Sequence, residues 1–281
     1  MSILFRIVLL VLILFLFNGI SSANQPLCGS THYDENLKLQ SLEIAVNENR
    51  KWNVNNTRII TDDSYLIQNK LKKKFLSKIK FNFKDSLSCT FDAKIRTHGN
   101  FKDHIFYKDG NLFQSLDVNL ISGNINNITK FKLFLKHTRG NFEDEIFMTT
   151  LLSEMGYLAP RTKMVNVKLN GQNIEMIFQE KITKEFLEYN NRREGPILEG
   201  DEKYMMEYAS KVKNNLGIDW YEIHNKFKLG KKIQLSKQTN SSWSIKNEKF
   251  IITSLIALSK LNQIYLEYLY NFSFDLSLIH I

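Results

Sequence analysis

The sequence predicts an α+β domain in which a mostly antiparallel sheet carries one packed helix and an incomplete helical region follows. Three observations in one continuous stretch predict this class. Apolar residues and lysines alternate from Lys130 to Lys136, apolar residues recur at spacings of three and four from Asp144 to Met155, and Asn170-Gly171 separates two short alternating runs. The order strand, amphipathic helix, hairpin therefore forms the centre of the predicted domain.

Earlier parts of the chain supply the remaining strands. Alternation predicts strands at Asn36 to Val46, within Lys80 to Ile95, and at Gln114 to Leu120. A helix is predicted between the first two, at Tyr65 to Lys78. These strands are expected to join the central strand in one sheet.

The central strand, Lys130 to Lys136, has two unlike faces. Phe131, Leu133 and Leu135 share one side, as expected of a strand that is buried on one face. The other side carries Lys130 and Lys132 and is therefore rich in positive charge.

The helix and the hairpin that follow have clear end signals. Gly156 stands where a helix C-terminus favours a left-handed residue, and Pro160 restarts the chain. Asn170-Gly171 tolerates the positive φ angles of a type I′ turn. The apolar side of the helix that is expected to pack on the sheet consists of Phe147, Met148, Leu151, Leu152 and Met155.

The C-terminal part is predicted to be helical. Helices are expected at Lys203 to Leu216 and at Lys246 to Tyr270, with the polar stretch Gln234 to Ser244 between them as a surface loop.

Several of these residues resemble the spore-coat protein H (CotH) kinase-like family. Leu158 to Lys181, LAPRTKMVNVKLNGQNIEMIFQEK, is similar to the family's stretch of "APRT", strand, "LNG" turn, strand and "EK". Ala93 to Asn100, AKIRTHGN, resembles its "RGN" turn, with Thr97-His98 where the family has an arginine directly before glycine. Ile197 to Asp201, ILEGD, resembles its acidic segment, so the resemblance spans Ala93 to Asp201.

The resemblance implies a fold and a division into domains. It implies a protein-kinase-like small lobe, a mostly antiparallel sheet with one packed helix, at residues 93–202. Residues 24–92 would form an N-terminal extension with the first strands, and residues 203–275 the start of a helical second lobe.

The same resemblance implies the residues that would bind ATP. Lys130 is the first candidate for the lysine that contacts the phosphates, and Lys132 is the second. Glu154 is the candidate for the helix carboxylate that holds this lysine, with Glu145 as the alternative. The family's earlier helix glutamate falls near Thr150 here, which cannot form an ion pair.

Further residues are implied to lie near the nucleotide. His98 and Gly99 would belong to a turn that covers the phosphates, and Glu180, followed by Lys181, would lie where the chain passes the adenine. Magnesium is expected with ATP, although its ligands are unknown, because the family's acidic ligands follow the helices. Walker, H-E-x-x-H, G-x-S-x-G and dinucleotide-binding motifs are absent from the sequence.

The function that the resemblance implies is that of an exported atypical protein kinase. When complete, it would transfer the γ-phosphoryl group of ATP to serine or threonine of an envelope or secreted protein, and this chain alone is expected to be inactive. The alternative is a non-catalytic surface, adhesion or binding module on the same fold. A third possibility is a basic envelope protein that holds anionic polymers.

The N-terminus has the pattern of a secretory signal peptide. Arg6 precedes the apolar run Ile7 to Phe17, and Ser21-Ser22-Ala23 supplies the small residues of a cleavage site. Residues 1–23 are therefore predicted to be removed, giving a secreted or periplasmic protein, while an uncleaved membrane anchor is the alternative. No later segment is apolar enough to span a bilayer.

The two cysteines, Cys28 and Cys89, both lie in the part predicted to be exported. An oxidising compartment favours a disulfide between them. Two unpaired buried thiols are the alternative, since spacing alone does not decide.

The net charge of +9 is concentrated at Lys70 to Lys84, where seven lysines occur. Such a stretch attracts an anionic surface or an acidic protein substrate, although no nucleic-acid motif accompanies it. A solvated lysine-rich face is the alternative.

The last residues, Leu276 to Ile281, have the sequence LSLIHI, which matches the translated inverted end of a widely used sequencing transposon. Residues 276–281 are therefore predicted to be a sequencing-adapter artefact. An ordinary apolar tail is the alternative.

Overall fold

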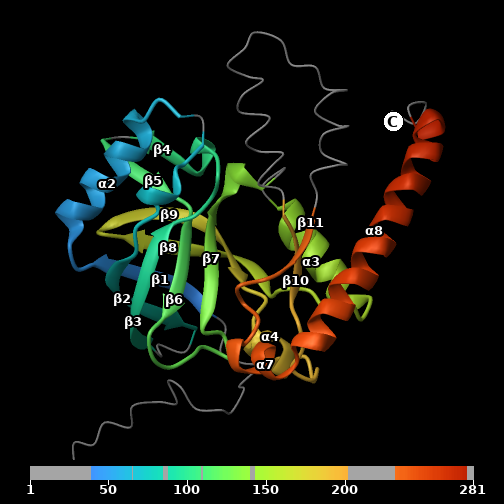
Figure 1. Ribbon diagram of the computed structural model, residues 1–281. Helices are drawn as coiled ribbons and strands as arrows, with labels where there is room; N and C mark the ends of the chain where they lie inside the picture. The colour runs from blue at the N-terminus through green and yellow to red at the C-terminus, as the bar shows by residue number, and fades with distance from the viewer. Residues whose placement is uncertain are drawn as a thin grey trace, which may run out of the picture.

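The computed structural model describes residues 39–64, 66–84, 88–108, 110–139, 143–201 and 232–276. Seven strands form a closed barrel in the order β1-β2-β3-β6-β7-β9-β8 (Figure 1). The barrel strands are β1 (Leu39–Val46), β2 (Phe75–Phe83), β3 (Ser88–Thr97), β6 (Leu116–Leu120), β7 (Lys130–Leu135), β8 (Thr162–Leu169) and β9 (Gln172–Glu180).

The closed barrel shows that the predicted kinase-like small lobe is wrong. Strand β1 pairs with β2 in antiparallel fashion and with β8 in parallel fashion, where Ser41 lies opposite Asn166 and Ile44 opposite Leu169. An open sheet would leave two edges with unpaired backbone groups, and this parallel pairing removes both. Neither partner's alternation pattern specifies such long-range pairing, so the sequence analysis did not find it.

The hairpin prediction is confirmed, and its turn also helps to close the barrel. Asn170 and Gly171 have φ angles of 47° and 93°, as a type I′ turn between β8 and β9 requires. The Asn170 side chain accepts a hydrogen bond from Val46 N at 2.9 Å, and its backbone N donates to Ile44 O at 2.8 Å. The turn that joins two strands therefore also holds the end of β1.

The barrel interior is filled by aromatic and branched apolar side chains. Phe131 stacks on Phe178 with ring centroids 4.7 Å apart and meets Phe81 edge-on at 5.9 Å. Strands β2 and β3 alternate strictly between buried and less buried positions. The predicted inward side of β7, which includes Leu133 and Leu135, lies in this core, so that prediction is confirmed.

A helix that the sequence analysis missed covers one end of the barrel. Helix α2 (Asn49–Thr61) buries Trp52 and Ile59, and the Trp52 ring meets Phe75 edge-on at 5.2 Å. Asparagine-rich sequence has a weak intrinsic helix preference, which hid this element. The helix predicted at Tyr65 to Lys78 is wrong, because a single 3₁₀ turn and the start of β2 occupy the described part of that range.

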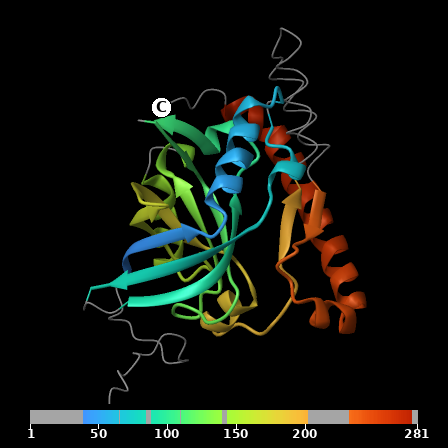
Figure 2. The same ribbon diagram turned by 90° about the vertical axis from the view of Figure 1, so that its left-hand side faces the viewer.

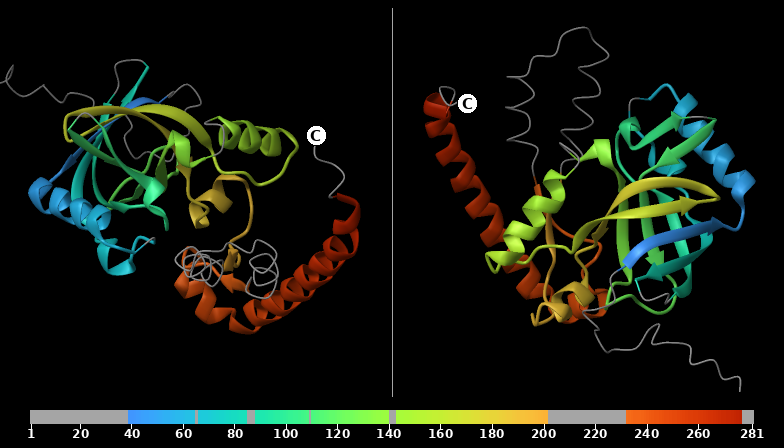
Figure 3. Two further views of the ribbon diagram at one scale, coloured as in Figure 1. Left: turned by 90° about the horizontal axis from the view of Figure 1, so that it is seen from above. Right: turned by 180° about the vertical axis from the view of Figure 1, so that it is seen from behind.

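The predicted helix at Asp144 to Met155 is confirmed as α3 (Asp144–Glu154), and Gly156 after it has a φ of +80°. Its packing differs from the prediction. Thr149 is the only buried residue of α3, whereas Phe147 and Met155 are 65% and 61% exposed. The helix lies beside β8 at the barrel wall (Figures 1 and 3). Its apolar residues Phe147, Met148, Leu151 and Leu152 are exposed.

The remaining elements lie outside the barrel. They are η1 (Asn69–Leu71), η2 (Lys102–His104), β4 (Ile105–Lys108), β5 (Asn111–Gln114), η3 (Lys136–Thr138), α4 (Lys184–Tyr189), β10 (Leu198–Asp201), β11 (Lys232–Leu235), α7 (Ser241–Lys246) and α8 (Glu248–Leu276). Strands β4 and β5 form one hairpin, and β10 and β11 form a second two-stranded sheet.

Helix α8 confirms the predicted C-terminal helix and extends beyond it to 29 residues. It stands apart from the barrel in the views from the side and from above (Figures 2 and 3). The polar stretch predicted as a loop at Gln234 to Ser244 instead contains the end of β11 and the start of α7. None of the described helices combines the length and apolar character needed to cross a membrane.

Several predicted features lie outside the described residues. These are the signal peptide, Cys28, the helix at Lys203 to Leu216, and residues 277–281. Cys89, on β3, is buried and takes part in a disulfide. Cys28 is the only other cysteine in the chain, so it remains the predicted partner of Cys89.

Candidate functional site

Four polar side chains form a row across the outer wall of the barrel. Strand register places Asp117 of β6 between Arg96 of β3 and Lys132 of β7, and Gln179 of β9 follows Lys132. They point to the outer side of the barrel because the residues before and after each of them are buried on the inner side. Barrel closure therefore brings together residues that are far apart in the sequence.

Asp117 is the buried acid at the centre of this row. Its carboxylate accepts hydrogen bonds from Arg96 Nη2 at 2.7 Å and from Lys181 Nζ at 2.8 Å. Burial alone would raise the pKa of Asp117, but the Lys181 and Arg96 charges outweigh burial and hold the pKa below its ordinary value. The carboxylate is therefore charged, and it neutralises one of its two cationic partners.

Lys132 has no such partner. Within the described ranges its ammonium forms no ion pair, and its Nζ lies over the Phe134 ring, 5.6 Å from the centroid. Burial lowers the pKa of Lys132, and the charges of Arg139 and Lys181 lower it further. Asp117 and Glu145 act in the opposite direction without restoring the ordinary value. Lys132 is thus a cation whose charge is poorly compensated.

Glu145 brings α3 to this lysine. Its Oε1 accepts a hydrogen bond of 2.5 Å from Gln179 Nε2, and Gln179 is the β9 residue paired with Lys132. Gln179 thus fixes the carboxylate of the first helical turn beside the lysine of β7. This arrangement connects the helix to the row through one amide.

Arg139 completes the group that we call the basic cluster, which consists of Arg96, Asp117, Lys132, Arg139 and Lys181. The Arg139 guanidinium lies over the Phe134 ring, with Cζ 3.9 Å from the centroid. Its Nε is buried and makes no hydrogen bond to a described residue. Four cations and one carboxylate give the cluster a net positive charge, which favours an anionic ligand.

A pocket of about 360 Å³ opens beside the basic cluster at the end of the barrel where β3 ends. We call it the basic pocket. Its lining residues are Lys72, Arg96, Thr97, His98, Gly99, Asn100, Phe101, Asp103, His104, Thr138 and Arg139. Arg96 and Arg139 belong to both the pocket and the cluster, so the two form one continuous positive region.

Gly99 shapes the wall of this pocket. Its φ is +102°, and a Cβ atom there would lie 2.0 Å from the Cδ2 atom of His104. Only glycine permits both this backbone conformation and the close approach of the imidazole. The glycine of the predicted phosphate turn therefore has a packing role in placing His104.

The two pocket histidines are neutral near pH 7. Burial, followed by the charges of Lys132, His104 and Arg139, lowers the pKa of His98 to about 2. Burial also lowers the pKa of His104, whose Nδ1 lies 3.0 Å from Ser115 Oγ. The pocket's positive charge therefore comes from its lysine and arginines.

Lys72 is the cation on the other side of the pocket. Its Nζ donates to Asn100 Oδ1 at 2.8 Å, and no carboxylate among the described residues pairs with it. Burial and the charge of Arg96 lower the pKa of Lys72. Like Lys132, it would gain stability from an anion in the pocket.

The first predicted pair, Lys130 and Glu154, is not brought together. Lys130 lies two residues before Lys132 on the same face of β7, and its Nζ donates to Gln238 Oε1 at 3.3 Å. Glu154 is exposed at the last residue of α3, and no ion pair of Glu154 with a described residue is found. The alternatives, Lys132 and Glu145, form no ion pair with each other, but both are connected to Gln179, Lys132 as its partner in the sheet and Glu145 by a hydrogen bond.

Glu180 has a structural partner. Its buried carboxylate pairs with Arg161, with Nε–Oε2 and Nη2–Oε1 both at 2.7 Å. The Arg161 guanidinium also donates to Asn126 O at 2.8 Å and stacks on the Tyr189 ring at 3.8 Å. This pair ties β8, β9 and α4 together, and Lys181 beside it belongs to the basic cluster.

The sequence analysis did not propose Lys72, Arg96, Asp117 or Arg139 as site residues. One usable signal was Asp117, an acidic residue within a short apolar strand, because buried acids need cationic partners. The others depend on strand pairing and loop positions that no local pattern specifies.

The lysine-rich stretch at Lys70 to Lys84 is partly balanced by acids on neighbouring strands. Lys78 and Lys80 of β2 are exposed, and they lie opposite Asp92 of β3 and Glu43 of β1 respectively. An anionic partner for this face remains a prediction.

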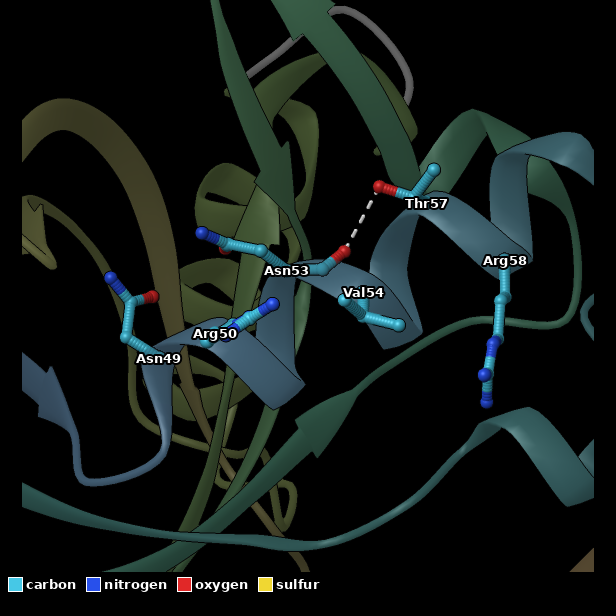
Figure 4. Close-up of a pocket in the computed structure, with 6 residues that line it drawn as sticks. All are labelled: Asn49, Arg50, Asn53, Val54, Thr57 and Arg58. Carbon is cyan, nitrogen blue, oxygen red and sulfur yellow. Dashed lines mark hydrogen bonds between the residues drawn. The ribbon is translucent and has the colours of Figure 1, made fainter.

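A second hollow, of about 520 Å³, runs along α2 (Figure 4). All its described lining residues come from that helix, including Arg50 and Arg58. Thr57 Oγ1 donates to Asn53 O at 3.0 Å, and Asn49 Oδ1 accepts from Asn170 Nδ2 at 2.8 Å. None of the predicted site residues lies in it.

In the described ranges, no three histidine, cysteine, aspartate or glutamate residues gather closely enough to hold a metal ion. Glu199 and Asp201, the acidic segment of the resemblance, lie in β10. We therefore assign no magnesium ligand.

Comparison with known proteins gives no family for the chain. No family model matches the sequence, and no curated protein sequence matches it.

Proposed function

We propose that this chain binds the triphosphate of ATP at the basic cluster, as the nucleotide-binding part of an exported protein that transfers phosphoryl groups to serine or threonine. The observation that carries the proposal is Lys132, a partly buried strand lysine without an ion pair in the described part of the chain, whose sheet partner Gln179 holds the carboxylate of Glu145 from α3. A strand lysine held by a helix glutamate is the pair that contacts the nucleotide phosphates in protein kinases.

The donor set suits a polyphosphate. Lys132 and Arg139 supply charges that no described carboxylate pairs with, and Asp117 holds Lys181 and Arg96 at fixed positions next to them. Fixed cations stabilise negative charge without reorganising during the reaction. ATP would supply the phosphoryl group, and magnesium bound to it would add further positive charge.

Glu145 has a positioning role in this proposal. Through Gln179 it keeps its carboxylate near Lys132, which favours the charged form of the lysine. Lys72, across the basic pocket, could contact the terminal phosphate or its acceptor.

The CotH-like stretch supports the same function. That family's arginine before glycine is His98 here, and burial and neighbouring cations keep His98 neutral. The turn therefore lacks one charge that the family has. This difference favours a second candidate, a non-catalytic module that binds a phosphorylated ligand at the same cluster.

Binding of Mg-ATP to the purified chain tests the proposal. Lys132→Met should weaken binding by about 10- to 100-fold, because a hydrogen bond to a charged group contributes roughly 1.5–3 kcal/mol. Lys130→Met is the matched control, since it removes a lysine two positions away on the same face, and it should change the affinity less than about threefold. Isothermal titration calorimetry measures both.

Equal loss of affinity in the two variants, or no binding of Mg-ATP by the unaltered chain, would contradict the role of the cluster. Binding of Mg-ATP that depends on Lys132, without transfer of a phosphoryl group to serine or threonine, would favour the binding module instead.

A further inference from the structure

Four asparagines stand in the Asn-x-Ser/Thr pattern of N-glycosylation acceptors: Asn55, Asn127, Asn240 and Asn271. In an exported protein this pattern allows a glycan to be attached to the asparagine amide, provided that the site lies on the surface. The positions of these asparagines in the fold differ, and the differences select among them.

Two of the four amides are engaged in the fold. Asn55 is only 4% exposed, and its Nδ2 donates to Leu71 O at 2.8 Å. Asn240 caps α7, because its Oδ1 accepts from Ser242 N and Trp243 N while its Nδ2 donates to Glu194 Oε1 at 2.6 Å. A glycan on either nitrogen would displace a contact that the structure uses.

Asn127 is placed differently. It follows Asn126 in the loop between β6 and β7. The φ angle is 48° at Asn126 and 64° at Asn127. Ile125 and Ile128 flank this two-residue turn and exchange backbone hydrogen bonds of 3.0 and 2.8 Å. Both positive φ angles and the paired flanks are those of a tight type I′ turn, whose flanking isoleucines are buried in the core.

The side-chain amide of Asn127 does not stabilise this turn. The residue is partly exposed, and its side chain makes no hydrogen bond to a described residue. The turn is fixed by other groups: Asn127 N donates to Asn124 Oδ1 at 3.1 Å, and Asn126 O accepts from Arg161 at 2.8 Å. Modification of the Asn127 side chain would therefore leave these contacts intact.

The turn lies at the opposite end of the barrel wall from the basic pocket. Strand β6 begins with Leu116, which pairs with Thr97 next to the pocket, and it ends near Asn119, which pairs with Lys130. The loop that contains Asn127 follows that second end. A glycan there would not cover the pocket.

We propose that Asn127 is an N-glycosylation site of this protein when it passes through a eukaryotic secretory pathway. The donor class is an oligosaccharide on a lipid pyrophosphate. A bond forms between Asn127 Nδ2 and the anomeric carbon, the bond from that carbon to the pyrophosphate oxygen breaks, and the amide loses one proton as the lipid pyrophosphate leaves. Entry into the pathway rests on the predicted signal peptide.

The test is expression of the whole chain, with its own N-terminus, in a eukaryotic cell that secretes proteins. Peptide-N-glycosidase F removes the glycan and converts the carrier asparagine to aspartate, so mass spectrometry of the peptides identifies the position. Conversion is expected at Asn127 and at neither Asn55 nor Asn240, while occupancy of Asn271 on α8 is read in the same spectra.

A matched pair of variants provides the control. Thr129→Ala destroys the acceptor pattern and Thr129→Ser keeps it. Thr129 Oγ1 is buried and makes no hydrogen bond to a described residue, so neither change removes a hydrogen bond of that hydroxyl. The glycan on Asn127 should be lost in the first variant and kept in the second. An unmodified Asn127 in both the medium and the whole-cell extract, or a glycan that persists in Thr129→Ala, would overturn the proposal.

Discussion

The barrel and helix α3 beside it use apolar residues in opposite ways. On β7, Phe131 and Leu133 are fully buried, whereas on α3, Leu151 and Leu152 are 40% and 36% exposed. The barrel closes on itself, and its apolar interior is completed by Trp52 of α2. Helix α3 and the described side chains of α8, by contrast, contribute no residue to that core.

This difference predicts where the stability of the described part resides. Strand pairing around a closed barrel satisfies the backbone and buries one face of every strand. Substitution of a buried ionic group on the barrel wall should also lower the stability strongly, because it leaves an unpaired buried charge. The exposed groups of α3 and α4 should tolerate substitution.

The largest effect is expected from breaking the buried ion pair between Arg161 and Glu180. The Glu180 side chain is 1% exposed, so Glu180→Gln leaves a poorly compensated arginine and should lower the free energy of unfolding by about 3–5 kcal/mol. The matched change on a helix is Glu188→Gln of α4, whose pair with Lys184 is 3.8 Å long and whose side chain is 57% exposed. It should cost less than about 1 kcal/mol, as measured by urea unfolding.

If the two glutamine variants unfold at similar urea concentrations, the buried pair contributes no more than a surface pair. The wall of the barrel would then not be more sensitive than the helices.

A leucine pair makes the same comparison for apolar residues. Leu133→Ala creates a cavity in the barrel core and should lower the free energy of unfolding by about 2–5 kcal/mol. Leu151→Ala on α3 removes the same atoms from a side chain that is already 40% exposed, and we expect a loss below about 1 kcal/mol. Equal losses in thermal or urea unfolding would mean that α3 is packed against something that covers Leu151.

The pH dependence of the free energy of unfolding should reveal the buried imidazole of His98. The pKa of His98 is lowered from 6.5 to about 2, by burial first and then by Lys132, His104 and Arg139, with Asp117 opposing. Its contribution to stability is therefore complete above pH 6.5 and is lost as the pH falls from 6.5 towards 2, because the unfolded chain takes up the proton first. One such group gives a slope of at most about 1.4 kcal/mol per pH unit.

His98→Gln should flatten the decline between pH 6.5 and pH 4 in urea unfolding measured at several pH values. The lowered pKa of Asp117 acts in the same direction at lower pH, since that contribution is present above about 3.8 and is lost below it. A slope that His98→Gln leaves unchanged would assign the decline to other groups.

The parts of the structure that the sequence predicted correctly are the local ones. The hairpin at Asn170-Gly171, helix α3 and the inward face of β7 follow from turn chemistry and periodicity within a few residues. Barrel closure was missed because β1 and β8 are far apart in the sequence and each pairs acceptably in an antiparallel sheet. Helix α2 was missed because asparagine is a weak helix former, while Trp52 and Ile59 stabilise it by burial against the rest of the structure.

The candidate site likewise has a part that the local sequence predicted and a part that it did not. The lysine-rich face of β7 was visible in the alternation, but the choice between Lys130 and Lys132 depends on what stands opposite each on other strands. Lys132 lies between Asp117 and Gln179, whereas Lys130 pairs with Asn119 and contacts Gln238. Strand register and burial decide that difference, and neither can be obtained from a single strand.

The smallest effect is expected on α3 itself. Phe147 is 65% exposed, so Phe147→Ser removes little buried area and should change the free energy of unfolding by no more than about 0.5 kcal/mol. Phe134→Ser is the contrasting change, because Phe134 is fully buried on the barrel wall beneath Arg139, and it should cost about 3 kcal/mol or more. Thermal unfolding compares the two serine variants directly. A large decrease in the free energy of unfolding for Phe147→Ser would show that the apolar side of α3 is covered in solution. The contrast between the buried apolar residues of the barrel and the exposed ones of α3 would then disappear.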